Sequence, residues 1–183
     1  MIQTGPARVT GWARVAKRIY YVMPIHQASA FEEAIDREIA SLRQVTEQAA
    51  AIKPALDAWS KKEELGHLID SAANNHVRFV RASLEPEFRG LGYRQDEWVR
   101  LHGYQEMAWT DIVDFWRRYN EFLVGLVKRI PEEKLLTPCV VGESATVTLK
   151  FLIEDYVLHM QHHLDHILER KKITAYPGAA VGV

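Results

Sequence analysis

Residues 149–167 of the chain read LKFLIEDYVLHMQHHLDHI. Apolar side chains recur there at steps of three and four residues, at Leu149, Leu152, Ile153, Tyr156, Val157, Met160, Leu164 and Ile167. This spacing is typical of an amphipathic helix that buries one face in a core. Thr146 or Thr148 can cap the start of the helix. The stretch also contains four of the eight histidines of the chain, so it bears on both the fold and the chemistry.

Three other segments have the same helical periodicity. The predicted helices cover residues 29–54, 60–84, 110–131 and 146–167. The first two begin with the patterns Ser29-x-x-Glu32 and Ser60-x-x-Glu63, which have the form of a capping box. Thr110 can cap the third helix, which ends at a proline. The sequence therefore predicts four long helices.

Four amphipathic helices without a convincing strand pattern predict an all-α four-helix bundle. The first two helices are joined by a short connection, which favours antiparallel neighbours. Residues 85–109 separate the second helix from the third, and that length allows a crossover. Because this loop contains five aromatic residues, we expect it to fold over one end of the bundle.

Length and composition predict one globular domain, since the chain has 183 residues, of which 48% are hydrophobic and 26% charged. We expect a basic arm of unknown role at residues 1–28, the bundle at 29–175 and a tail at 176–183. The formal net charge is -1, which disfavours binding to nucleic acid. No apolar run approaches the roughly 18 residues of a membrane span. The single cysteine, Cys139, excludes an internal disulfide, so we expect a cytoplasmic protein with an incidental loop thiol.

The four histidines of residues 149–167 form two pairs on a helical wheel. At about 100° per residue, His159 and His163 lie at the edge of the apolar face, whereas His162 and His166 point outward. Either pair has the i, i+4 spacing that allows two imidazoles to bind one metal ion. Only His159 and His163 can face a cleft between helices. We therefore expect these two residues to be metal ligands.

A third ligand must come from another segment, and His67 of the second predicted helix is the candidate. His67 lies opposite the apolar face of that helix, in a polar stripe with Asp70, Ser71, Asn74 and Arg78. On the residues alone, two interpretations stay open. The stripe is either a solvated face or the lining of a water-filled pocket, which a catalytic metal requires for its exchangeable positions.

Several neighbouring residues also have two interpretations. Asp70 and Asp155 lie one turn from the candidate ligands, where each could accept a ring N–H bond or organise water. The alternative is that both are carboxylates on a helix surface, and for Asp155 the two interpretations are equal. Arg78 and Arg81 could bind an anionic substrate, although most arginines on a polar stripe are simply solvated. His76 lies on the apolar side of its helix and is expected in the core or in an interface.

Two motifs together resemble the DinB/YfiT-like superfamily of four-helix metalloproteins. They are Trp59-Ser60-x-x-Glu63-x-x-Gly66-His67-Leu68-x-Asp70-Ser71 and Asp155-Tyr156-x-x-His159-x-x-x-His163. The stretches Asn74-Asn75-His76-x-Arg78-Phe79 and Gln95-Asp96-Glu97-Trp98 strengthen the resemblance, which covers approximately residues 31–170.

The resemblance implies a bundle with a crossover after the second helix and a divalent metal held by His67, His159 and His163. It also favours the open pocket over the solvated face. Members of the family often have Gln where this chain has His166. Whether His166 adds a titratable group to the pocket stays open.

Three neutral imidazoles leave the full positive charge on the metal and leave positions for water or substrate. Such an ion can lower the pKa of bound water or hold a thiol as its thiolate. Nickel and zinc are the favoured metals, and iron and manganese are alternatives, because imidazole accepts all of them.

Two functions follow as hypotheses. The first is a metal-dependent transferase, with a low-molecular-weight thiol as one candidate substrate, or a metal-dependent hydrolase. The second is a non-catalytic, stress-associated metal-binding or scaffold bundle, with a homodimer as one assembly. An open site favours the first, because structural metal sites are usually closed by a fourth protein ligand.

Overall fold

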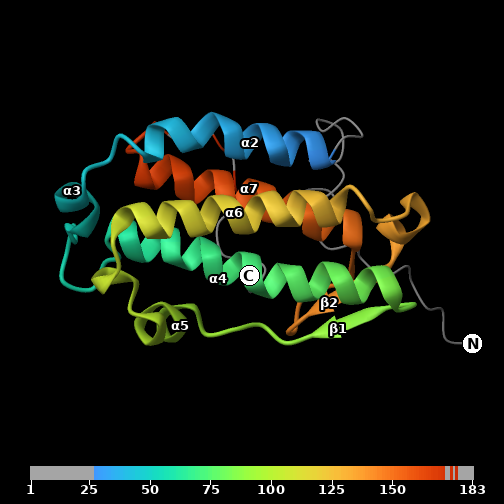
Figure 1. The fold of residues 1–183 in the computed structure, drawn as a ribbon. Helices are drawn as coiled ribbons and strands as arrows, with labels where there is room; N and C mark the ends of the chain where they lie inside the picture. The colour runs from blue at the N-terminus through green and yellow to red at the C-terminus, as the bar shows by residue number, and fades with distance from the viewer. Residues whose placement is uncertain (1–26, 172–173, 175, 177–183) are drawn as a thin grey trace, which may run out of the picture.

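Four long helices lie side by side in the computed structural model, which describes residues 27–171, 174 and 176 (Figure 1). They are α2 (Gln27–Leu42), α4 (Lys61–Leu84), α6 (Trp109–Val127) and α7 (Leu149–Ile167). Helix α4 packs against α6 and α7, and α2 packs against the same two helices. The predicted four-helix bundle is confirmed. The arm predicted for residues 1–28 lies outside the described residues, except for the last two, which belong to α2.

Two of the predicted helix starts are confirmed. At α4, the Ser60 hydroxyl accepts a bond from the Glu63 backbone N–H, and the Glu63 carboxylate accepts one from the Ser60 N–H, which completes the capping box. At α7, the Thr148 hydroxyl accepts a bond from the Phe151 N–H at 3.2 Å. Both caps satisfy backbone donors that have no partner inside their helices.

The other two predicted starts are wrong. Ser29 lies inside α2, which already includes Gln27. Thr110 lies inside α6, whose N-cap residue is Ala108 and makes no side-chain capping bond. Near this end, the backbone N–H of Trp109 donates instead to a Glu47 carboxylate oxygen at 2.7 Å. The carboxylate of a residue distant in the sequence therefore bonds to this helix end, where a local capping side chain was predicted.

The first predicted helix is also divided. Helix α2 ends at Leu42, and a separate short helix, α3 (Glu47–Ala51), follows it. Thr46 caps α3 by accepting a bond from the Ala49 N–H at 3.2 Å. Because Thr competes for backbone groups in this way, it favours a helix start over a helix interior. The apolar periodicity continues across the break and conceals it.

A small sheet of three strands was not predicted from the sequence. Strand β1 (Phe88–Gly90) pairs in parallel with β2 (Pro138–Val141), which pairs in antiparallel fashion with β3 (Val147–Thr148). Strands of two to four residues are too short to produce a recognisable alternation. Cys139 is fully buried in β2, so its expected position in a loop is wrong. Burial raises the pKa of its thiol to about 11.

The crossover between α4 and α6 packs along α4 (Figure 1). It contains β1, helix α5 (Gln95–His102) and the 3-10 turn η1 (Tyr104–Glu106), and each of these contacts α4. The ring of Tyr104 lies so close to Gly66 that a Cβ atom there would be 2.1 Å from its Cδ2. Glycine at this position allows the crossover to cover α4 beside the predicted ligand His67.

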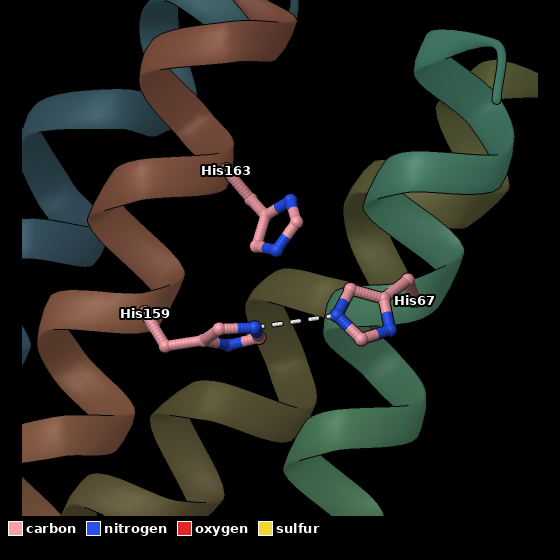
Figure 2. Close-up of side chains that lie close together, drawn as sticks. All are labelled: His67, His159 and His163. Carbon is pink, nitrogen blue, oxygen red and sulfur yellow. Dashed lines mark hydrogen bonds between the residues drawn. The ribbon is translucent and has the colours of Figure 1, made fainter. Parts of the chain in front are cut away.

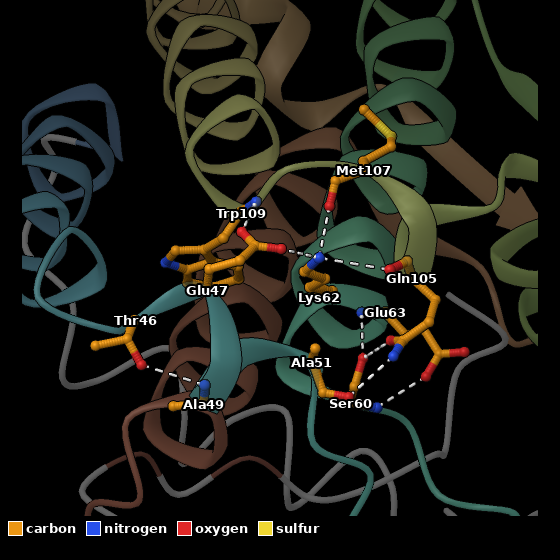
Figure 3. A network of polar contacts seen from close by, with 10 residues as sticks. All are labelled: Thr46, Glu47, Ala49, Ala51, Ser60, Lys62, Glu63, Gln105, Met107 and Trp109. Carbon is orange, nitrogen blue, oxygen red and sulfur yellow. Dashed lines mark hydrogen bonds and ion pairs between the residues drawn. The ribbon is translucent and has the colours of Figure 1, made fainter.

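A buried lysine ties the crossover to the bundle (Figure 3). Lys62 is 4% exposed, and its Nζ donates to the carbonyl of Met107 at 2.7 Å and to the carboxylate of Glu47. The other oxygen of Glu47 accepts the bond from Trp109 described above. Helices α3, α4 and α6 and the end of the crossover therefore meet at one polar network.

No helix in the described part of the chain is long and apolar enough to cross a membrane.

Candidate metal centre

Three histidines from two helices converge between α4 and α7 (Figure 2). The Nε2 atoms of His67 and His159 lie 3.3 Å apart. The ring of His163 is centred 4.8 Å from that of His67 and 4.6 Å from that of His159. One nitrogen of each ring lies within 4.8 Å of the others, which is close enough for all three to hold one ion. The structure thus brings together the three predicted ligands, which are separated by up to 96 positions in the sequence.

Burial keeps two of these imidazoles neutral. His67 is fully buried, and this desolvation, helped by the nearby His163, lowers its pKa to about 3. His159 is 3% exposed, and burial lowers its pKa well below the usual value. A neutral imidazole keeps a nitrogen lone pair that a proton would otherwise occupy. Both rings are therefore available as ligands at neutral pH.

The spacing of the nitrogens fits a bound ion. Two imidazole nitrogens that bind one zinc ion at about 2.0–2.1 Å with tetrahedral angles are separated by roughly 3.3 Å. His67 and His159 have this separation. All three nitrogens belong to imidazole rings, and nickel, zinc, iron and manganese all accept imidazole as a ligand. The residues present consequently fit a divalent transition metal.

Two partners orient the rings, and sequence reasoning missed both of them. The Nδ1 atom of His163 lies 2.9 Å from the Oε1 atom of Glu64, and Nδ1 of His67 lies 3.3 Å from the hydroxyl of Tyr93. The Glu64 carboxylate accepts the Nδ1 proton of His163 and leaves its Nε2 for the metal, and the Tyr93 hydroxyl holds the His67 ring in place from its Nδ1 side. The i, i+3 spacing of Glu64 and His67 on α4 was the available signal for Glu64. Nothing local indicates Tyr93, which comes from the crossover.

His159 differs from the other two rings. Its Nδ1 is buried and has no hydrogen-bond partner among the described residues. The ring of Tyr176 packs against it, with centroids 5.6 Å apart, and the Tyr176 hydroxyl bonds to Asp155. Tyr176, the first residue of the predicted tail, therefore lies beside the candidate centre. Trp59 packs against the His67 ring, with the ring centroids 5.0 Å apart.

The two predicted orienting carboxylates make other contacts. An oxygen of Asp70 accepts a bond from the Tyr104 hydroxyl at 2.7 Å and lies 2.8 Å from Nδ1 of His102. Asp155 contacts Tyr176, and burial raises the pKa of its carboxyl to about 6. Asp70 thus contacts Tyr104 and His102, and Asp155 contacts Tyr176. Among the described residues, neither carboxylate contacts a ring of the triad.

The polar stripe of α4 is not a solvated face. His67, Asp70 and Ser71 are almost completely buried, and Arg78 is 5% exposed. The crossover covers them, since Tyr93 and Tyr104 belong to it. Arg81, in contrast, lies on the surface and forms an ion pair with Glu85.

The remaining histidines follow the wheel in outline. His166 is exposed, and its Nδ1 lies 3.4 Å from the Glu64 carboxylate, whereas His162 is half-buried against Tyr176. Glu64, His163 and His166 also lie close enough together to form a second cluster of potential ligands. His76 is half-buried and contacts the Tyr119 hydroxyl at 3.3 Å, between α4 and α6.

Comparison with known proteins identifies the family. The family model of the DinB superfamily matches residues 30–167. The chain belongs to this superfamily, as the resemblance of its motifs predicted.

Two relatives are similar in sequence. A protein of Oceanobacillus iheyensis named "Putative metal-dependent hydrolase" is 28% identical over 112 residues, which are 60% of this chain and 63% of the relative. A protein of Bacillus mycoides with the same descriptive name is 23% identical over 150 residues, which are 74% of this chain and 84% of the relative. The match to the first of these relatives covers slightly less than two thirds of its length.

Solved structures share the fold. YfiT from Bacillus subtilis, described as "a probable metal-dependent hydrolase with an unusual four-helix bundle topology", has a TM-score of 0.70 at 17% identity, and the match covers 91% of each chain. A mycothiol-dependent maleylpyruvate isomerase has a TM-score of 0.61 at 10% identity, covering 76% of this chain and 58% of that one. A DinB-like protein of Bacillus subtilis has a TM-score of 0.53 at 18% identity, covering 79% and 91%.

Proposed function

We propose that the chain is a metal-dependent hydrolase whose divalent ion is held by His67, His159 and His163. The observation that carries this proposal is the convergence of three imidazole nitrogens within 4.8 Å of one another. The two relatives named as metal-dependent hydrolases support the reaction class. A divalent ion with open positions supplies Lewis acidity, which polarises a carbonyl and activates water near neutral pH.

The residues around the triad prepare it for this role. Tyr93 and Glu64 hold the rings of His67 and His163, so that each presents Nε2 to the centre. Burial lowers the pKa values of His67 and His159 and so keeps both rings unprotonated. Among the described residues, the cluster around His67 has no fourth protein ligand. That leaves coordination positions for water and substrate, as a catalytic site requires.

A thiol transferase is the second candidate function. It is favoured by the shared fold with an isomerase that depends on mycothiol, a thiol cofactor. The same open positions that accept water would accept a thiol as thiolate. In this alternative, the substrate thiol replaces water as the nucleophile, and the histidines keep their roles.

Metal content tests the ligand assignment. Purified wild-type protein, incubated separately with Ni²⁺, Zn²⁺, Mn²⁺ or Fe²⁺ and then desalted, should retain one ion per chain of at least one metal by elemental analysis. His67→Ala, His159→Ala and His163→Ala should each lose it. His162→Ala, on the same helix, is the matched control and should retain it. Unchanged metal content in all three variants would refute the assignment.

Activity assays then separate the candidate functions. The loaded protein and a chelator-treated sample are tested against a panel of esters and amides and against electrophiles with an added low-molecular-weight thiol. Chelator-sensitive hydrolysis without thiol supports the hydrolase, and a strict requirement for thiol supports the transferase. X-ray absorption that reports four protein ligands and no water would instead indicate a structural ion in a non-catalytic bundle.

A further inference from the structure

The polar stripe of α4 continues from the triad to a buried arginine. His67, Ser71, Asn75 and Arg78 follow one another at steps of four, four and three residues, so they share one face of the helix. All four are buried, with 0%, 0%, 2% and 5% exposure. Polar groups on one buried helix face need partners, and the first three residues have them.

Arg78 is incompletely satisfied. Its Nη1 donates to the Asn75 side-chain oxygen at 3.3 Å, whereas its Nη2 is buried and has no hydrogen-bond partner in the described chain. Within the described residues, none of the ion pairs closer than 4 Å includes Arg78. A buried guanidinium without a close counter-ion is unfavourable, since its lost hydration is not replaced. Among the described residues, the Arg78 guanidinium therefore lacks a close anionic partner.

Arg78 faces the surroundings of the candidate centre. Its charge interacts with Tyr93 and with Asp155. Tyr93 contacts the His67 ring, and Asp155 bonds to Tyr176, which packs against the His159 ring. Arg78 is thus linked to the His67 ring through Tyr93, and to the His159 ring through Asp155 and Tyr176.

Helix geometry sets the distance between Arg78 and the triad. Residues 67 and 78 are three turns apart, or roughly 16 Å along the axis. Side chains on a helix lean toward its N-terminus, which for Arg78 is the direction of the triad. An elongated small molecule could therefore reach both groups.

We propose that Arg78 binds an anionic group, a carboxylate or a phosphate, of the substrate whose reacting group lies at the three histidines. The inference rests on the proposed function, because it places the reaction at the triad. A planar guanidinium binds these anions with two parallel hydrogen bonds from two of its nitrogens, and Nη2, which has no partner among the described residues, would supply one of them. Arg78 would select acidic substrates and fix their orientation.

The competing explanation is structural. In that case Arg78 would be retained as a distant electrostatic partner of Asp155 and would stabilise the fold. The two explanations predict opposite effects on thermal stability. Removing an uncompensated buried charge should raise the melting temperature without ligand, whereas removing a structural partner should lower it.

The test uses full-length metal-free protein with acetate and inorganic phosphate as probes, and acetamide as the neutral match of acetate. Binding is measured by isothermal titration calorimetry, and melting temperatures are measured without probe. Wild type should bind at least one of the two anions, and if it binds acetate, it should bind acetamide at least tenfold more weakly. Arg78→Met should lose at least tenfold in anion affinity and melt at the wild-type temperature or above it. Arg78→Lys, which keeps the charge without the fork, should bind with intermediate affinity.

Arg81→Met is the control, because this exposed arginine pairs with Glu85 and should leave anion affinity unchanged. Absence of binding of both anions to wild type, equal anion affinity in Arg78→Met, or a lower melting temperature in both Arg78 variants would each overturn the proposal. Binding of acetate alone indicates carboxylate substrates, and binding of phosphate alone indicates phosphate esters. Since metal-free protein is used, failure of the metal assignment would appear in the metal content and not in these titrations.

Discussion

The carboxylate of Glu64 lies 2.9 Å from Nδ1 of His163, and this contact joins α4 to α7 at the candidate metal centre. A carboxylate at this distance accepts the Nδ1 proton and orients the ring, so that Nε2 is left with its lone pair. The same oxygen lies 3.4 Å from Nδ1 of the exposed His166. Glu64 therefore connects His163 of the triad to the exposed His166.

Removal of Glu64 should weaken metal binding without removing a ligand. Glu64→Ala is expected to lower the affinity for zinc by about 10–100-fold, because the His163 ring loses its orienting partner. Competition titration with a zinc chelator measures this change. His166→Asn, which alters the other contact of Glu64, should keep wild-type affinity. Equal zinc affinity in Glu64→Ala and wild type would exclude an orienting role.

Acid should destabilise the metal-free protein through His67. Its pKa is about 3 in the fold against 6.5 in a free histidine. Between these values the unfolded chain binds a proton that the folded chain does not, so the free energy of unfolding falls as the pH drops through this window. Urea unfolding at pH 7, 6, 5 and 4 should show this loss, and His67→Gln should show a smaller one. Parallel pH profiles for the two proteins would contradict the assignment.

Asp155 should have the opposite effect. Its pKa is raised from 3.8 to about 6 by burial, so the folded chain holds a proton between these values that the unfolded chain has lost. The fold loses this advantage as the pH rises through 6. Asp155→Asn should therefore be more stable than wild type at pH 8, by up to about 3 kcal/mol, with the difference disappearing below pH 4. Urea unfolding at these two pH values tests the prediction, which a pH-independent difference would contradict.

The Lys62 network should contribute measurably to stability. Lys62→Met removes the buried donor to Glu47 and to the Met107 carbonyl and leaves that carbonyl without this partner. We expect a loss of about 1–3 kcal/mol in the free energy of unfolding. Lys53→Met breaks only a partly exposed pair with Glu63 and should cost less than about 1 kcal/mol. Denaturant titration of both variants provides the comparison, and similar losses would contradict a special role for Lys62.

Gly66 should be intolerant of even one added methyl group. Gly66→Ala places a Cβ atom 2.1 Å from the Tyr104 ring, so the crossover must move away from α4. A destabilisation of about 1–3 kcal/mol is expected. Tyr104→Ala should cost less in the Gly66→Ala background than in wild type, because the clash is then relieved. Thermal unfolding of the four proteins measures this coupling, and strict additivity would show that the two residues act independently.

Local patterns predicted the main helices because each helix carries its own periodic apolar face. The capping box of Ser60 and Glu63 and the cap at Thr148 were also readable, since their hydrogen bonds span only three residues. The helix starts at Ser29 and Thr110 were wrong. Near the second, a carboxylate from Glu47 binds the backbone of Trp109, and no local pattern contains that contact.

The residues of the candidate site also differ in whether local patterns could predict them. The i, i+4 spacing of His159 and His163 indicated a pair of ligands, because one helix fixes their relative position. The family resemblance was needed for His67, since its polar stripe had two equal interpretations. Tyr93 and Tyr176 reach the triad from the crossover and from the segment after α7, which no spacing rule relates to a histidine.

The sequence by itself determined four amphipathic helices, a chain without internal disulfides and two imidazoles on one helix face, because these properties depend on neighbours within one or two turns. The tertiary structure decided that the α4 stripe is buried, since only the packed crossover excludes water from it. That burial lowers the pKa of His67, and it encloses the Arg78 Nη2, which has no hydrogen-bond partner among the described residues. The chemistry of both residues thus depends on desolvation, which arises only when distant segments pack together.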